Sequence, residues 1–126
     1  RTDVYIKMCD MACDLQKSFK ENIENNIYVR WYDKNKMEIH HIVTEKNLQL
    51  PDSAVVLFTQ EQIENILCPN CVPLTLMERI VSVWRWEKEY WAIFETFEQF
   101  WFAFLMKDKF ELVWNEIQED WVKVIK

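Results

Sequence analysis

The chain has 126 residues, of which half are hydrophobic and 29% are charged, a balance typical of a folded globular protein. It contains no glycine, which excludes a Walker loop, a dinucleotide fingerprint, a GxSxG nucleophile elbow and collagen, because each needs backbone geometry that only glycine supplies. The formal charge is -6, so we expect no nucleic-acid partner, since such partners are bound by basic residues that neutralise phosphates. The most apolar segment, residues 100–106, is about a third of the length that crosses a bilayer, and we expect no membrane association.

The first part of the chain, residues 1–83, predicts a mixture of strands and helices. Residues 4–8 predict a short strand, after which Asp10 caps a helix whose apolar residues recur every four positions. These apolar residues are Met11, Leu15, Phe19 and Ile23. Residues 27–32 and 37–44 are rich in β-branched and aromatic side chains and flank a polar turn. They predict a β-hairpin in which Trp31 faces inward and Arg30 outward.

A second group of signals lies in the middle of the chain. Residues 54–58 predict a short buried strand, and Thr59 with Gln62 predicts a capping box at the start of the next helix. Two prolines then interrupt residues 68–73. We expect a single domain over residues 1–126, in which any internal subdivision lies near residues 68–73.

The last part, residues 84–126, holds six of the seven tryptophans and predicts helices. Residues 73–91 predict a long helix, with a strand as the competing interpretation over residues 80–86. Thr96 and Gln99 predict a second capping box before an apolar helix. Residues 108–126 predict a final helix with an apolar stripe through Trp114, Ile117 and Trp121. The fold class is therefore α+β, with a mixed N-terminal part that contains a β-hairpin and an aromatic-rich helical C-terminal part.

Four cysteines, Cys9, Cys13, Cys68 and Cys71, leave three chemistries open. Together they offer four thiolates for a tetrahedral zinc ion, although the 54 residues between the two pairs are an unusually long spacing. The adjacent His40 and His41 point to opposite faces of a predicted strand, so at most one of them joins such a site.

Two disulfides are the second possibility, and they require an oxidising compartment. Free thiols of an intracellular protein are the third, and we favour them because the chain has no Asn-x-Ser/Thr glycosylation sequon. A redox-active CxxC is disfavoured, because the motif follows a predicted helix and Pro73 prevents a helix from starting directly after it. Because the sequence begins at Arg1, we also expect that a preceding segment has been removed.

The excess of aromatic residues is the basis of the functional prediction. The interface candidates are Trp84, Trp86, Trp91, Trp101, Trp114 and Trp121. Tryptophan dominates protein interfaces, so the leading prediction is a non-catalytic interaction or adaptor module that binds a protein partner or a second copy. A bulky aromatic core and a stacking site for a flat ligand are the competing interpretations of the same rings.

Two further functions stay open as alternatives, a secreted disulfide-stabilised binding or effector protein and a small zinc-stabilised domain. Apart from zinc, we expect no cofactor. No constellation of nucleophile, base and orienting group stands out, so we do not expect an enzyme.

Overall fold

The computed structural model describes residues 2–45, 48–69 and 73–124 of the chain. The α+β fold class is confirmed. The elements, in chain order, are α1 (Thr2–Met11), α2 (Cys13–Glu21), β1 (Tyr28–Asp33), β2 (Glu38–Val43), β3 (Ala54–Val56), α3 (Gln60–Leu67), α4 (Pro73–Trp86), α5 (Lys88–Trp91), α6 (Phe97–Phe110), β4 (Leu112–Asn115) and β5 (Asp120–Lys123).

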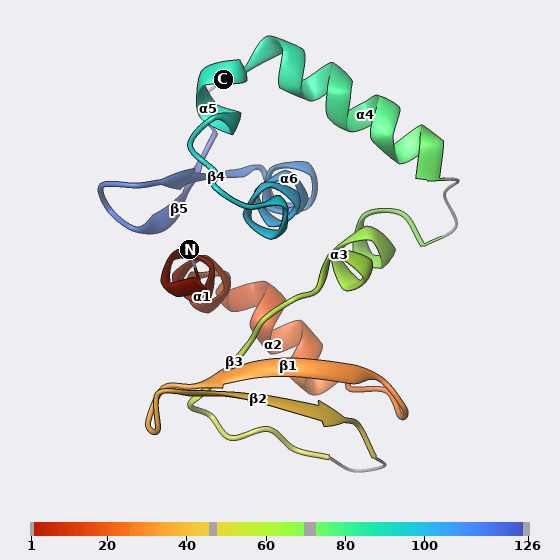
Figure 1. Ribbon diagram of the computed structural model, residues 1–126, viewed down its shortest axis with the longest axis vertical. Helices are drawn as coiled ribbons and strands as arrows, with labels where there is room; N and C mark the ends of the chain where they lie inside the picture. The colour runs from red at the N-terminus through yellow and green to blue at the C-terminus, as the bar shows by residue number, and fades with distance from the viewer. Residues whose placement is uncertain (1, 46–47, 70–72, 125–126) are drawn as a thin grey trace.

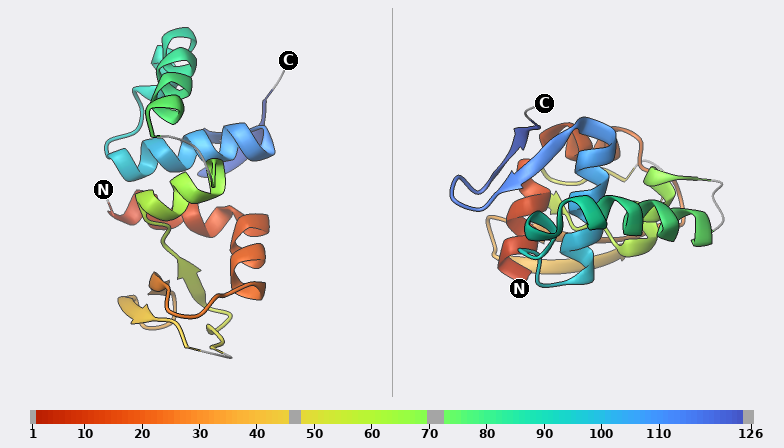
Figure 2. Two further views of the ribbon diagram at one scale, coloured as in Figure 1. Left: turned by 90° about the vertical axis from the view of Figure 1, so that its right-hand side faces the viewer. Right: turned by 90° about the horizontal axis from the view of Figure 1, so that it is seen from above.

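The elements are stacked along the longest axis of the molecule (Figure 1). An antiparallel sheet with strand order β2-β1-β3 lies at one end, and α4 lies at the other. Between them are α1, α2 and α3 on one side of the sheet, and α6 with the β4–β5 hairpin beyond these helices, as both side views show (Figures 1 and 2). Within the described part of the chain, no helix has the length and apolar character needed to cross a membrane.

The predicted hairpin of β1 and β2 is confirmed, with Trp31 paired with His40 and Arg30 with His41. Side chains along β1 alternate as expected, so that Val29 and Trp31 are buried. The expectation for Arg30 was incomplete, because its guanidinium forms an ion pair with Glu98 of α6. This pair ties the sheet to the helical part of the chain.

The predicted strand at residues 4–8 is wrong, because this segment belongs to α1. Its buried residues Tyr5, Met8 and Cys9 are spaced as one face of a helix. The helix predicted from Asp10 begins instead at Cys13, where Ala12 occupies the N-cap without a side-chain bond. It ends before Ile23, so only Leu15 and Phe19 of the predicted stripe lie within α2.

The helices after residue 72 follow the prediction in part. The helix predicted over residues 73–91 divides into α4 and the short α5, because Glu87 leaves the helical conformation at φ -137°. The competing strand at residues 80–86 does not form. At the start of α6 the hydroxyl of Thr96 accepts a hydrogen bond from the Gln99 backbone at 3.1 Å, while the Gln99 side chain caps the N–H of Glu95 rather than that of Thr96.

The final helix predicted over residues 108–126 is wrong, because α6 continues to Phe110 and residues 112–123 form the β4–β5 hairpin. Trp114 and Trp121 are seven residues apart, which resembles two helical turns, but they face each other across the two strands. The side chain of Asn115 accepts hydrogen bonds from the backbone of Ile117 and Gln118 and so organises the turn. Ile117, expected in the buried stripe, is 96% exposed at this turn.

Candidate functional site

A groove of about 850 Å³ lies between α2, the start of β1 and α3, and we call it the α2–α3 groove. Its described lining residues are Leu15, Ser18, Phe19, Asn22, Glu24, Asn26, Ile27, Tyr28, Phe58, Thr59, Gln60, Glu61, Gln62, Asn65 and Ile66. This volume is within the range of sites that bind ligands or partner segments.

The floor of the α2–α3 groove is apolar and aromatic. Leu15 and Phe19 lie one helical turn apart on α2, which places both side chains on the face that meets Phe58. The rings of Phe19 and Phe58 pack edge to face with centroids 5.5 Å apart. Phe58 is fully buried while Phe19 is only partly buried, so the Phe19 ring is the more accessible of the two.

The rim of the groove is polar and negatively charged. Glu24 precedes β1 and Glu61 lies in the first turn of α3, and both side chains are exposed. Side-chain amides occupy other positions of the rim, namely Asn22, Asn26, Gln60 and Asn65. Of the described lining residues, two are acidic and none is basic, so the groove favours a cationic or neutral occupant.

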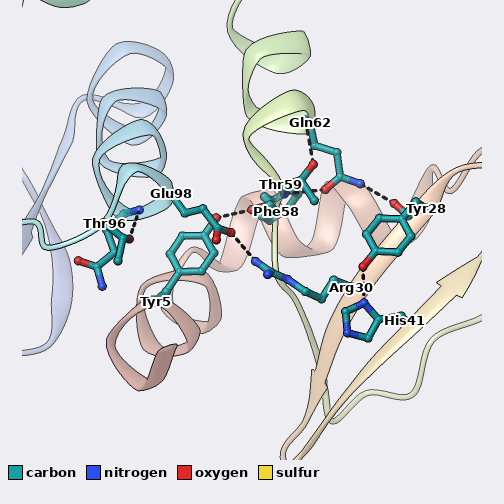
Figure 3. A network of polar contacts seen from close by, with 10 residues as sticks. Tyr5, Tyr28, Arg30, His41, Phe58, Thr59, Gln62, Thr96 and Glu98 are labelled. Carbon is teal, nitrogen blue, oxygen red and sulfur yellow. Dashed lines mark hydrogen bonds and ion pairs between the residues drawn. The ribbon is translucent and has the colours of Figure 1, made fainter. Parts of the chain in front are cut away.

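One wall of the groove is held in place by the capping box of α3, as Figure 3 shows. The hydroxyl of Thr59 accepts from the backbone of Gln62 at 3.2 Å, and the Gln62 side chain accepts from the backbone of Thr59 at 2.9 Å. The same side chain donates to the carbonyl of Tyr28 at 2.9 Å, which joins the start of α3 to the start of β1. This predicted capping box therefore also positions a binding surface.

Hydrogen bonds of two tyrosine hydroxyls complete this wall. The hydroxyl of Tyr28 bonds to Nδ1 of His41 on the neighbouring strand, and the Tyr28 side chain remains 47% exposed beside the groove (Figure 3). Tyr5 of α1 donates to the carbonyl of Phe58 at 2.5 Å, which fixes the backbone behind the floor. His40 instead stacks on Trp31 with ring centroids 4.5 Å apart, so the two histidines occupy opposite faces of the sheet as expected.

The tryptophans predicted as interface candidates lie mostly inside the chain. Trp91, Trp101, Trp114 and Trp121 are 3 to 7% exposed and belong to the hydrophobic core. These four rings therefore stabilise the chain itself and offer little surface to a partner. The side chains of Trp84 and Trp86 lie outside the part of α4 that the structure describes.

The cysteines proposed as metal ligands do not come together where the structure describes them. Cys9 is a buried free thiol and Cys13 an exposed one, while Cys68 is disulfide-bonded and Cys71 lies outside the described residues. No bridge therefore joins Cys9 or Cys13 to the second cysteine pair. Burial raises the pKa of the Cys9 thiol to about 12. Among residues 2–45, 48–69 and 73–124, no group of three or more His, Cys, Asp or Glu side chains is arranged to hold a metal ion.

Sequence reasoning did not identify the α2–α3 groove. Phe19 was predicted on a helix face and residues 27–32 as a strand, but these patterns do not reveal that an open groove remains between the two elements. The capping box of Thr59 and Gln62 was the one local signal at this site. Comparisons with protein-family models, with curated proteins and with solved structures find no match to this chain.

Proposed function

We propose that this chain is a non-catalytic recognition module whose α2–α3 groove binds a segment of a partner protein. The observation that carries the proposal is the combination of an aromatic floor and an acidic, amide-rich rim. Protein interfaces have this arrangement, with a dry apolar centre surrounded by polar groups. The amides of Asn26 and Asn65 suit the backbone of a bound peptide, because each offers both a donor and an acceptor.

The charge of the rim defines the chemistry of the partner segment. Glu24 and Glu61 attract Lys or Arg, and the net charge of the chain acts in the same direction. The floor of Leu15, Phe19 and Ile66 accepts aliphatic or aromatic side chains. The preferred segment therefore carries apolar anchors flanked by basic residues.

A selection from random peptides tests this proposal. Peptides displayed on phage are selected against the full chain, with the double variant Glu24→Lys/Glu61→Lys as the counter-target. Glu89→Lys/Glu116→Lys, at two exposed positions outside the groove, changes the net charge by the same amount and is the matched control. We expect enrichment of sequences that combine Leu, Phe or Trp with Lys or Arg. Enrichment of acidic sequences, or of sequences that bind the double variant equally well, would contradict the proposal.

The dependence on ionic strength follows from the same surface. Burial of apolar area is insensitive to salt, whereas exposed charges are screened within about 10 Å at 0.1 M salt. Binding of a selected peptide should therefore weaken less than about tenfold between low and high salt, unlike a nucleic-acid contact, which loses several orders of magnitude. A loss of that larger size would mean that charge, and not the apolar floor, dominates binding.

A further inference from the structure

A second apolar surface lies at the opposite end of the molecule, and we call it the α4–α6 patch. Three of its side chains are unusually exposed, since Met77 is 50%, Val81 44% and Phe97 79% accessible. They surround a hollow of about 430 Å³ that is also lined by Ile80, Phe94 and Phe100. Contiguous apolar surface of this kind commonly marks an interaction site.

The position of α4 makes this surface accessible. The helix forms the extreme end of the long axis, and the view from above shows it lying over the rest of the fold (Figure 2). Leu76 and Ile80 point into the core, while Met77, Glu78, Val81 and Arg85 are exposed. Met77, Val81 and Arg85 recur every four positions, and Glu78 lies three positions before Val81, so these side chains form one stripe along the helix.

The charges along this stripe are complementary to those of a second, antiparallel copy of α4. Glu78 and Arg85 lie at equal distances from a point between residues 81 and 82. A second α4 that runs antiparallel about this point therefore places Glu78 of one copy opposite Arg85 of the other, twice. A parallel arrangement would instead place like charges together, which is unfavourable. Arg79 does not take part, because it pairs with Asp108 at 2.7 Å within the chain.

We propose that the α4–α6 patch binds a second copy of this chain through an antiparallel pair of α4 helices. Val81 packs against its counterpart near the two-fold axis, and Met77 and Phe97 lose their contact with water in both copies. The contact is isologous, so it closes into a dimer and does not propagate into a filament. This proposal is independent of the α2–α3 groove, which lies at another part of the surface.

Sedimentation equilibrium of the full chain tests the proposal, over a concentration range of roughly a hundredfold. We expect the wild type to change from monomer to dimer as concentration rises. Val81→Glu should sediment as a folded monomer, because the exposed side chain adds a charge at the axis without disturbing the core. Ile117→Glu, which makes the same type of change at the β4–β5 turn, should dimerise like the wild type.

Charge exchange identifies the residues that meet across the axis. Glu78→Arg and Arg85→Glu should each raise the dimer dissociation constant at least tenfold, and the double variant should restore it to near the wild-type value. A wild type that remains monomeric, a Val81→Glu variant that still dimerises, or a double variant no better than the single ones would each overturn the proposal. Glu24→Lys/Glu61→Lys should dimerise normally, which separates this test from that of the groove.

Discussion

The side-chain amide of Gln16 pairs with both backbone polar groups of Val56, 40 residues further along the chain. Its oxygen accepts from the Val56 N–H at 2.9 Å, and its nitrogen donates to the Val56 carbonyl at 2.9 Å and to the Cys9 carbonyl at 3.0 Å. Gln16 is 7% exposed. It therefore pairs the backbone N–H and C=O at the edge of β3 as a neighbouring strand would, and it joins α1 and α2 to the sheet.

Replacement of Gln16 by leucine should be strongly destabilising. The substitution leaves three buried backbone groups without this partner, and an unsatisfied buried group costs about 1–3 kcal/mol. We expect the free energy of unfolding, measured in urea, to fall by about 2–4 kcal/mol. Lys17→Ala, on the exposed side of the same helix, should change it by less than about 0.5 kcal/mol. Equal effects of the two substitutions would contradict the role assigned to Gln16.

The two free thiols should differ sharply in reactivity. Cys9 is fully buried with a pKa raised to about 12, and the thiolate is the form that attacks thiol reagents, so Cys9 should react only after unfolding. Cys13 is exposed and should react in the native protein. A thiol assay on native protein checks this, since Cys13→Ser should remove the fast phase that Cys9→Ser retains. A fast phase that persists in Cys13→Ser would show that the interior near Cys9 opens readily.

The absence of glycine leaves other residues in the left-handed region of the backbone. Met37 ends the hairpin turn at φ 56°, and Asn26 precedes β1 at φ 60°. This conformation costs an ordinary residue roughly 1 kcal/mol or more, whereas asparagine tolerates it. Met37→Gly should therefore stabilise the protein by up to about 1 kcal/mol, and Asn26→Gly should change its stability much less. Thermal unfolding measures both, and destabilisation by Met37→Gly would contradict the turn geometry.

The β4–β5 hairpin should owe its stability to its tryptophan pair. Trp114 and Trp121 pack with ring centroids 5.0 Å apart, and Trp121 also donates to the carbonyl of Met8 at 2.9 Å. Trp114→Ala should lower the free energy of unfolding by about 3–5 kcal/mol, as expected for a core aromatic residue. Ile117→Ala should have little effect, because its side chain is almost fully exposed. A large effect of Ile117→Ala would contradict the hairpin and favour a helix in which Ile117 is buried together with the two tryptophans.

The same hairpin illustrates which parts of the fold local sequence patterns can predict. The β1–β2 hairpin and the Thr59–Gln62 capping box were predicted, because each depends on residues close together in the chain. The β4–β5 hairpin was predicted as a helix, since the seven-residue spacing of Trp114 and Trp121 fits both two helical turns and a cross-strand pair with six residues between. Only the packing of these rings against α1 and α6 distinguishes the two.

The functional surfaces were harder to predict for a related reason. Periodicity identifies which side chains share a face, but it does not say whether another element of the same chain covers that face. Four of the tryptophans predicted as interface candidates are buried by other parts of the chain, whereas Phe97 and Tyr28 remain accessible. Burial of this kind depends on tertiary contacts between distant segments, such as the bond between Gln62 of α3 and Tyr28 of β1.

The most direct test of the proposed function is the affinity of one selected basic, apolar peptide, labelled with fluorescein and titrated by fluorescence anisotropy. The wild type and the charge-matched control Glu89→Lys/Glu116→Lys should bind it with the same dissociation constant. Glu24→Lys/Glu61→Lys should bind it at least tenfold more weakly, which corresponds to about 1.4 kcal/mol. Unchanged affinity in this double variant, with the fold intact by circular dichroism, would show that the peptide binds outside the α2–α3 groove and would contradict the proposal.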